Sequence, residues 1–385
     1  MENTPYYFYD LDLLNRTLNE VETNVKNTLF NVHYAIKANN NKKVVSFIAS
    51  RNFGADCVSA GEIALALECG FDAADIVYAG VGKSDEEIEF ALLNNVGVLH
   101  CEGLEELIVI NEIAARLKRT PKIALRLNPD INPKTHEKIS TGLRENKFGF
   151  SALEYSELAE LHSTLTNIQI VGLHFHIGSQ ILDLSVYVDL CNRINELVPV
   201  FEERFGKLMY LNVGGGLGID YQNPEKNPIA DFETYFDIFK TYLTIDPSVP
   251  VHFELGRSIV AQCGSLRTKV LYIKRSDTKT FAVVDAGMTE LLRPAMYGAY
   301  HKIEKFSPGF DLPKVNYDVV GPLCESSDCF GKNVPLPELK RGDIVVLKSC
   351  GAYGESMSLT YNSRPRIKSI TSENILTQLR IIKTA

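Results

Sequence analysis

The sequence contains no tryptophan and only five methionines, and no apolar run approaches the roughly 18 residues that a membrane-spanning helix needs. Its start, MENTPYYFYD, lacks the basic and then apolar pattern of a secretory signal peptide. Positive charge is also scarce, because 40 lysines and arginines stand against 48 acidic residues, a net charge of -8. This surplus of acid disfavours non-specific binding to nucleic acid or anionic membranes. We therefore expect a cytoplasmic protein that binds neither.

Cysteine pairs with the spacing of metal ligands are missing too. The eight cysteines include no Cys-X-X-Cys pair, so nothing indicates a structural zinc site or a redox centre. We expect a reducing compartment, with most cysteines acting as small buried hydrophobic residues. They are Cys57, Cys69, Cys101, Cys191, Cys263, Cys324, Cys329 and Cys350.

Length and composition predict a globular protein with a sizeable core. The chain has 385 residues, of which 45% are hydrophobic and 23% charged, as in ordinary soluble proteins. Between about residues 30 and 255, short apolar runs alternate with amphipathic stretches. The runs predict eight strands, near 32–36, 54–58, 76–79, 96–100, 123–127, 170–175, 209–213 and 251–254.

Eight strands, each followed by a helix, are typical of an α/β fold, the (β/α)8 barrel of ~250 residues. Apolar residues recur at helical spacing in 60–69, 84–93, 102–117 and 152–162, whereas the pattern of the last helix is less clear. A doubly wound parallel sheet is the competing fold, and the strand count favours the barrel. We place the barrel at residues 28–262.

After residue 260 the pattern changes to strands separated by turns, at 266–274, 281–285, 318–320 and 343–348. This pattern predicts a second, mostly β domain, formed by residues 263–385 together with 1–27. The segment TPYYFYD reads as a short strand that could pair with this second domain.

Reactive and flexible residues follow the ends of the predicted barrel strands. The chemistry of an α/β barrel gathers at the carboxyl ends of its strands, so these residues are expected to share one rim. In chain order they are Lys37, Asp56 with Ser59, Gly80 with Gly82, Cys101, Arg126, His176 with Ser179, Gly214 to Gly216, and Glu254 with Arg257.

Lys37 closes the run VHYAIK, so its ammonium is expected to emerge from an apolar strand into the barrel mouth. Desolvation there would lower its pKa and favour the neutral amine, which can form a Schiff base. A lysine that merely extends from a strand end to solvent is the simpler alternative, and the other residues of the rim favour the Schiff base.

A run of three glycines, Gly214, Gly215 and Gly216, follows the seventh predicted strand in NVGGGLG. Without a Cβ, backbone N–H groups there can approach a phosphate, although glycine runs also form simple tight turns. The run does not fit the dinucleotide fingerprint, but it suits a single phosphate group with Ser179 and Arg257 nearby.

His174 and His176 are two apart on a predicted strand and therefore face the same side. They could form a metal pair, with His100 or His136 as a further ligand. We favour no metal, with His176 packed flat against an aromatic cofactor ring and His174 in the core.

Glu254 and Arg257 lie in HFELGR at the eighth strand end. A carboxylate facing a pyridine nitrogen would keep that nitrogen protonated, and an arginine can bind phosphate or carboxylate through two hydrogen bonds. A local surface ion pair is the simpler alternative, and it would contribute little.

The second domain places polar residues next to glycine or proline in LRPAMYGAYH, GPLCESSD and CGAYGESMS, as loops that form sites often do. Cys324 lies in a turn beside acids, so its thiol should resist ionisation, which favours a proton donor over a nucleophile. A small apolar filler is the alternative. The clustered residues are Arg293, Tyr297, Cys324, Glu325, Asp328 and Tyr353.

Taken together and in this order, YAIKAN, HIGSQ, GGGLG, ELGRS, LRPAMYGAYH, GPLCESSD and GAYG resemble the pyridoxal-phosphate decarboxylases of the alanine-racemase barrel fold. The resemblance runs from about Tyr6 to Arg366. It implies pyridoxal 5'-phosphate as cofactor, an amino-acid substrate and a homodimer whose sites are completed across subunits.

The resemblance also implies a role for each matching residue. Lys37 would carry the cofactor as a Schiff base, His176 would stack on its ring, and Glu254 would face the pyridine nitrogen. Other implied cofactor contacts are Asp56, Glu62, Arg126, Ser179, Gly214, Gly215, Gly216, Gly256, Arg257 and Tyr353. Implied substrate contacts are Arg257, Arg293, Tyr297, Glu325 and Tyr353, and Cys324 of a second subunit would protonate the product.

One departure from the family pattern is visible, because Leu255 stands where the family has proline in Glu-Pro-Gly-Arg. Leucine lacks the fixed φ of proline, but every charged group is kept, so we expect activity to be retained and Leu255→Pro to change cofactor affinity little.

Charge predicts the kind of substrate. Glu325 suits a distal ammonium, and Arg293 with Tyr297 suits a distal carboxylate, so a substrate carrying both is favoured over lysine or ornithine. A decarboxylase of ornithine, lysine or carboxynorspermidine is the alternative within the same fold. Two other classes stay open: a noncatalytic pyridoxal-phosphate carrier, which explains Lys37 and the glycine run, and a metal-dependent barrel hydrolase, which explains the histidine pair.

Overall fold

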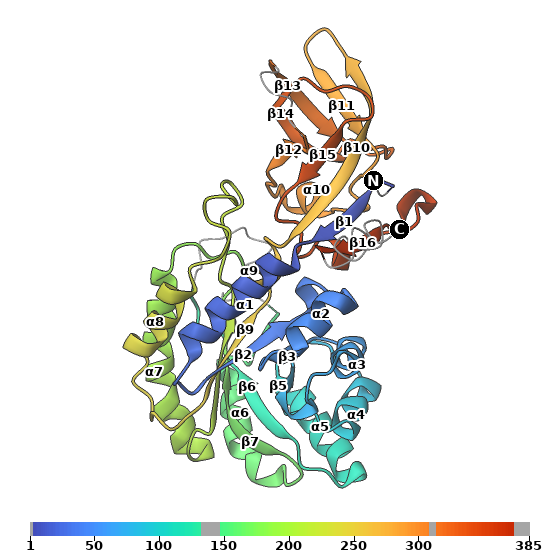
Figure 1. The fold of residues 1–385 in the computed structure, drawn as a ribbon. Coiled ribbons are helices and arrows are strands. Elements are labelled where there is room, and N and C mark those ends of the chain that lie inside the picture. Colours follow the sequence, from blue (N-terminus) through green and yellow to red (C-terminus); the bar gives the residue numbers. More distant parts are fainter. Residues whose placement is uncertain (1–2, 132–146, 308–312, 373–385) are drawn as a thin grey trace, which may run out of the picture. The chain divides into compact units, whose positions relative to one another are not determined.

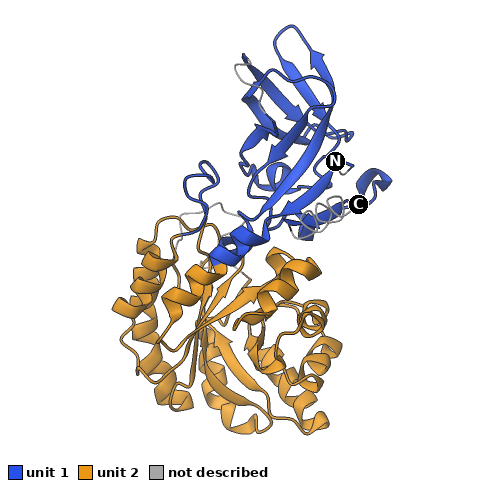
Figure 2. Cartoon of the chain, in the orientation of Figure 1, with its two compact units in different colours: residues 1–17, 219–230, 257–385 blue, residues 18–218, 231–256 orange. Residues whose placement is uncertain are grey.

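The computed structural model describes residues 3–131, 147–307 and 313–372 (Figure 1). The chain divides into two compact units (Figure 2). Unit 2, the barrel unit, comprises residues 18–218 and 231–256, and unit 1, the sheet unit, comprises residues 1–17, 219–230 and 257–385. No helix of the described part is long and apolar enough to cross a membrane.

The barrel unit contains a closed parallel barrel of eight strands in chain order, and β2 pairs with β9 to close it (Figure 1). The predicted barrel is therefore confirmed, and the open doubly wound sheet is wrong. The strands are β2 (Phe30–Ala35), β3 (Gly54–Cys57), β4 (Ile76–Tyr78), β5 (Val98–Cys101), β6 (Lys122–Arg126), β7 (Gln169–His174), β8 (Tyr210–Gly215) and β9 (Val251–Leu255).

Helices follow these strands, and several begin at side-chain caps. Ser84 and Ser151 form capping boxes at α4 and α6, and the Ser59 side chain accepts from the Glu62 N–H at the start of α3. The described helices are α1 (Leu11–Val25), α2 (Lys42–Ala49), α3 (Ala60–Cys69), α4 (Asp85–Leu93), α5 (Leu104–Leu117), α6 (Ala152–Leu161), α7 (Ser185–Phe205), α8 (Phe232–Tyr242), α9 (Arg257–Val260) and α10 (Arg293–Tyr297). The indistinct pattern after the eighth strand corresponds to α9, which has only four residues.

The sheet unit contains a sheet in the order β12-β15-β10-β11-β13-β14, with β1 paired to both β10 and β16. The segment around Tyr6 is thus a strand of this unit, as predicted. Its strands are β1 (Tyr6–Tyr9), β10 (Gly264–Arg275), β11 (Thr280–Val284), β12 (Ile303–Lys305), β13 (Lys314–Val320), β14 (Cys329–Pro337), β15 (Ile344–Leu347) and β16 (Lys368–Thr371).

The unit boundaries differ from the expected limits at residues 28 and 262. Residues 219–230 belong to the sheet unit because their side chains bond within it. Glu225 pairs with Lys302 at 2.7 Å, and the Tyr221 hydroxyl accepts a hydrogen bond of 2.8 Å from Arg257.

Candidate active site

Lys37 directly follows β2, in the single turn Ile36–Ala38. Its Nζ lies 2.8 Å from Oδ2 of Asp56 on β3, and the two side chains are 33% and 0% exposed. The structure therefore differs from the expectation of a neutral amine in apolar surroundings, because a carboxylate at this distance stabilises the ammonium form. Sequence position predicted both residues but not their pairing.

Asp56 offers a second oxygen to the site. Its Oδ1 is buried and has no hydrogen-bond partner among the described residues. Burial raises the pKa of Asp56, Glu254 raises it further, and Lys37 opposes both effects. A buried acceptor of this kind needs a donor, which a bound molecule can supply.

Glu62, in the first turn of α3, lies within the electrostatic influence of this pair. Its Oε2 accepts a hydrogen bond of 2.8 Å from the Val58 N–H. Burial raises its pKa to about 7, although that hydrogen bond and Lys37 act to lower it.

Glu254 on β9 is another enclosed acid of the barrel, at 4% exposure. Asn212 Nδ2 donates to its Oε1 at 3.0 Å, and ring nitrogens of His174 and His100 lie 3.3 Å and 3.2 Å away. Burial works to raise the pKa of Glu254, but these imidazoles hold it well below its usual range. The barrel thus contains a buried carboxylate suited to a positively charged ring nitrogen.

His100 corrects the sequence analysis of the histidines. It stacks on His174 with ring centroids 4.0 Å apart, so His174 has His100 and Glu254 as neighbours. Ligand atoms of these three residues lie within 4.8 Å of one another, close enough to contact one ion. A hydrogen bond of 3.3 Å between His174 Nε2 and Glu254 Oε2, together with the stacking of His100 on His174, accounts for the same arrangement. His136 lies outside the described residues.

His176 and Ser179 lie on the loop after β7, and both are partly buried. His176 Nδ1 accepts a hydrogen bond of 3.3 Å from the Gly215 N–H. Burial, reinforced by Lys37 and Arg126, lowers the pKa of His176 to about 3. A neutral imidazole is suited to stacking against an aromatic ring.

The glycine run ends β8 where backbone segments approach closely. A Cβ on Gly215 would lie 1.8 Å from the Glu254 carbonyl oxygen, and Gly216 has a φ of 102°. Glycine is therefore required at both positions by the backbone itself. The run ends β8 and lies next to His176, so it brings backbone N–H groups to the end of the barrel where His176 lies.

Arg126 at the end of β6 bonds to a residue that the sequence analysis missed. Its Nη1 lies 2.5 Å from Oε1 of buried Glu102, whose Oε2 accepts from the Gly149 N–H at 2.9 Å. Its guanidinium also lies over the Phe148 ring, 4.6 Å from the centroid. The position of Glu102 directly after β5 was the signal that could have identified it.

The sheet unit brings several of its predicted residues together. Arg257 donates to the Tyr221 hydroxyl at 2.8 Å and lies 4.9 Å from the Tyr353 ring centroid. Arg293 lies 4.8 Å from the Tyr221 ring centroid, and its Nη1 is 2.7 Å from His301 Nε2. Tyr221 and His301 were not predicted, because nothing local in their segments marks them as neighbours of two arginines.

His301 is a neutral neighbour of Arg293. Burial lowers the pKa of His301 to about 3, with Arg293 contributing. Burial likewise lowers the pKa of Arg293. A buried guanidinium beside neutral groups is suited to an anion such as a carboxylate.

The segment around Cys324 is exposed. The neighbouring Glu325 accepts a hydrogen bond of 2.7 Å from the Tyr361 hydroxyl, another residue that the sequence analysis missed. Tyr297 lies at the end of α10, in the helix that Arg293 begins.

Three candidates have structural roles instead. Asp328 braces its own loop by accepting from the Met288 and Leu323 N–H groups at 2.7 and 2.8 Å. Ser59 caps α3. Cys101 is buried, which raises the pKa of its thiol, and its Sγ contacts the Gly103 carbonyl.

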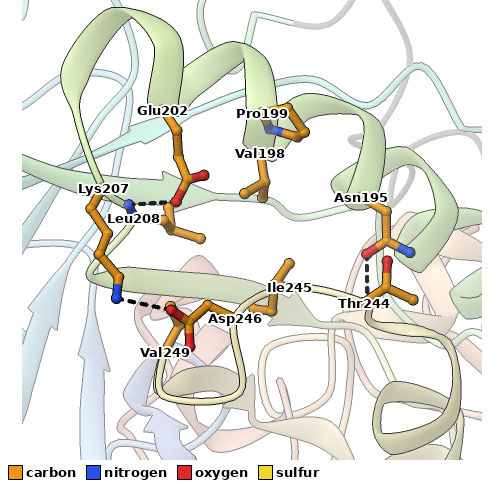
Figure 3. A pocket seen from close by; sticks show the side chains of 10 residues that line it. All are labelled: Asn195, Val198, Pro199, Glu202, Lys207, Leu208, Thr244, Ile245, Asp246 and Val249. Atoms are coloured by element: carbon orange, nitrogen blue, oxygen red, sulfur yellow. Dashed lines mark hydrogen bonds and ion pairs between the residues drawn. The ribbon is translucent and has the colours of Figure 1, made fainter.

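A separate pocket of about 480 Å³ lies on the barrel unit, beside residues that precede β8 and β9 (Figure 3). Its polar groups pair with one another: Lys207 with Asp246 at 2.9 Å, and Glu202 with the Leu208 N–H at 3.0 Å. This pocket adjoins the beginnings of β8 and β9, whereas Lys37 and Glu254 lie at the carboxyl ends of barrel strands.

A family model described as the pyridoxal-binding domain of pyridoxal-dependent decarboxylases matches residues 11–261. The chain belongs to this family, whose members bind pyridoxal in the barrel described above. The resemblance seen in the sequence and its cofactor are thereby confirmed.

Particular relatives have one activity in common. Diaminopimelate decarboxylase of Bacteroides thetaiotaomicron is 48% identical over 374 residues, covering 97% of this chain and 96% of the relative. The crystal structure of Helicobacter pylori diaminopimelate decarboxylase complexed with L-lysine has a TM-score of 0.91 and 40% identity, covering 97% and 93% of the two chains. The structure of diaminopimelate decarboxylase from M. jannaschii in co-complex with L-lysine has a TM-score of 0.87 and 33% identity, covering 96% of this chain and 88% of that one.

Proposed function

We propose that the chain releases carbon dioxide from meso-2,6-diaminopimelate and forms L-lysine, the last step of lysine biosynthesis, with pyridoxal 5'-phosphate as its cofactor. The observation that carries the proposal is the barrel end where Lys37 pairs with Asp56 and a second buried carboxylate, Glu254, keeps its charge. Relatives of this activity at 40–48% identity, one of them complexed with L-lysine, support the substrate and the product.

The residues of the barrel fit the cofactor. Asp56 Oδ1 is a buried acceptor that could receive a hydrogen bond from the cofactor, and Glu254 is a buried anion that could pair with its positively charged ring nitrogen. Lys37 supplies the amine that binds the cofactor carbonyl. The residues that would hold the cofactor are Lys37, Asp56, Arg126, His176, Ser179, Gly214, Gly215, Gly216, Glu254, Gly256, Arg257 and Tyr353.

When bound, pyridoxal phosphate takes up the electron pair left behind as carbon dioxide departs. Glu254, which its lowered pKa leaves ionised, would keep a proton on the ring nitrogen. His176 would hold the ring by stacking as a neutral imidazole. Cys324 would donate a proton to the α-carbon of the product, and Lys37 would hold the cofactor between turnovers.

Substrate choice depends on the distal end of the substrate. Glu325 binds the distal ammonium, Arg293 with Tyr297 binds the distal carboxylate, and Arg257 and Tyr353 complete the contacts. Lysine or ornithine would leave the Arg293 guanidinium desolvated without its carboxylate, which costs about 1–3 kcal/mol. The site therefore favours diaminopimelate.

We further propose a cytoplasmic homodimer in which Cys324 and Glu325 reach the site of the other subunit. The exposure of Cys324 supports this arrangement, because a side chain that serves a second subunit has to be accessible in one chain.

The test is carbon dioxide release by the purified protein loaded with pyridoxal phosphate. We expect release from meso-diaminopimelate with stoichiometric L-lysine, and little from ornithine, lysine or carboxynorspermidine. Equal or faster turnover of one of these three would reassign the substrate. Cofactor binding without release from any of them would make the protein a carrier, and loss of activity with a chelator would indicate a metal-dependent hydrolase.

A further inference from the structure

Glu254 belongs to a hydrogen-bonded group of polar side chains in the barrel core. Tyr210 and Asn212 are on β8 and His100 is on β5, and all three are buried. Tyr210 belongs at the same time to the apolar cluster of Val77, Val98, Ala124 and Val171. It therefore connects the apolar interior of the barrel to the polar surroundings of Glu254.

Three hydrogen bonds fix the orientation of the Asn212 amide. Its Oδ1 accepts from the Gly214 N–H at 2.8 Å, while its Nδ2 donates to Glu254 Oε1 and to the Tyr210 hydroxyl, each at 3.0 Å. The flipped amide would direct its oxygen at a carboxylate. Asn212 thus uses both amide hydrogens, and the Tyr210 oxygen is an acceptor for one of them.

The hydrogen of the Tyr210 hydroxyl then determines the tautomer of His100. Within the described part of the chain, the remaining polar neighbour of this hydroxyl is His100 Nε2, at 2.9 Å. If Nε2 accepts this hydrogen, the hydrogen of a neutral imidazole lies on Nδ1, which is 3.2 Å from Glu254 Oε1. The opposite tautomer would bury the hydroxyl hydrogen without an acceptor and direct a nitrogen lone pair at the carboxylate.

We propose that Tyr210 is a positioning residue, which acts on Glu254 through His100 and Asn212. Its hydroxyl accepts from Asn212 and donates to His100, so that the Asn212 amide directs a hydrogen at the carboxylate and the ring hydrogen of His100 lies on Nδ1, 3.2 Å from Glu254 Oε1. His174 directs Nε2 at the same carboxylate from 3.3 Å. These donors keep Glu254 ionised and leave its charge available to the ring nitrogen of the cofactor, so the inference rests on the proposed function.

The ionisation of the neighbouring groups agrees with this assignment. Burial and His100 lower the pKa of His174 to about 3, and burial raises the pKa of Tyr210 well above its usual value. His174 is thus neutral and Tyr210 keeps its hydrogen. The titratable groups whose charge acts on Glu254 or responds to it are His33 on β2, Asp56 on β3, His100 on β5, His174 on β7, His176 after β7, Tyr210 on β8, Tyr235 on α8 and His252 on β9.

Tyr210→Phe should change the pH dependence of cofactor binding. Without the hydroxyl, His100 is no longer held in the Nδ1–H form, Glu254 loses a donor, and its pKa rises. A carboxylate with a raised pKa becomes protonated as the pH falls, so the loss appears on the acidic side. We expect the ratio of variant to wild-type cofactor dissociation constants to be near one at about pH 9 and to reach about tenfold where the pH lies about one unit below the raised pKa of Glu254.

The matched control is Tyr235→Phe. Tyr235 is another fully buried tyrosine of this unit, and its hydroxyl has no hydrogen-bond partner among the described residues. Its variant should keep the wild-type dissociation constants across this pH range. The proposal would be overturned by a folded Tyr210→Phe variant whose ratio of dissociation constants to the wild type does not depend on pH. A merely structural role would weaken cofactor binding equally at every pH.

A second measurement needs no variant at Tyr210. In the wild-type protein loaded with pyridoxal phosphate, 15N NMR of labelled histidines reports which ring nitrogen carries hydrogen, and the His100→Gln spectrum assigns the signal. The proposal requires the neutral Nδ1–H form of His100, and either an Nε2–H form or an imidazolium at about pH 7.5 would overturn it. Because this readout involves no substrate, it is separate from the carbon dioxide assay that tests the proposed function.

Discussion

Single residues in the barrel derive their chemistry from partners that the sequence does not mark. Lys37, Asp56 and Glu254 could be predicted because they follow or end strands of a barrel. Their partners could not, since the pairing of Lys37 with Asp56 and of Glu254 with Asn212 depends on strand register. Local pattern locates a reactive group, whereas tertiary structure decides its charge.

Arg293 is the residue on which the choice of substrate should depend. We expect Arg293→Gln to lower kcat/KM for meso-diaminopimelate by roughly 10- to 100-fold, because a charged hydrogen bond to the distal carboxylate is lost. Steady-state kinetics on diaminopimelate measure the effect.

Arg267→Gln is the control for this change. Arg267 is also an arginine of the sheet unit stacked on an aromatic ring, 4.2 Å from the Phe8 centroid, but we assign it no role in the site. It should keep kcat/KM near the wild-type value. An equal loss in both variants, or none in Arg293→Gln, would contradict the role of Arg293.

Strands and loops of the barrel are fixed mainly by burial and backbone proximity. The barrel strands were predicted to within a few residues because apolar runs such as Ile76–Tyr78 are buried throughout. β14 was missed because it contains Gly331, Pro335 and Pro337 and its burial does not alternate. β12 was missed because it has only three residues.

The close approach of β8 and β9 at Gly215 requires a residue without a Cβ at this position. In Gly215→Ala the added Cβ would meet the Glu254 carbonyl oxygen at 1.8 Å. The two strands have to separate, so we expect the free energy of unfolding to fall by about 3 kcal/mol. For a chain of 385 residues that is a lower thermal midpoint by about 4 °C, measurable by calorimetry.

Gly82→Ala provides the comparison, since a Cβ there would meet no atom within 4 Å. It should leave the thermal midpoint close to that of the wild type. If Gly215→Ala melted like Gly82→Ala, close backbone approach would not be the reason for glycine in this run.

The molecule as a whole combines a barrel unit, which the pyridoxal-binding family model matches, with a separate sheet unit. Fold class and the family could be predicted from ordered motifs spanning most of the chain, which periodicity alone would not have given. The division into units could be predicted only approximately, because residues 219–230 join the sheet unit through Tyr221 and Glu225, whose partners are far away in the sequence.

A site shared between subunits can be tested by complementation. Lys37→Ala and Cys324→Ser should each be nearly inactive, and coexpression should restore activity. With random pairing about half of the dimers are mixed, and each mixed dimer has one intact site, so about a quarter of wild-type activity is expected. No recovery in isolated mixed dimers would mean that each site is built from a single chain.

The most direct test of the account is to locate the bond between cofactor and protein. Borohydride reduction of the protein loaded with pyridoxal phosphate, followed by peptide mass spectrometry, should place the pyridoxyl group on the peptide containing Lys37 and on no peptide of the Lys37→Ala variant. A label on a different lysine of the wild-type protein, or no label at all, would contradict the assignment of this barrel end as the active site.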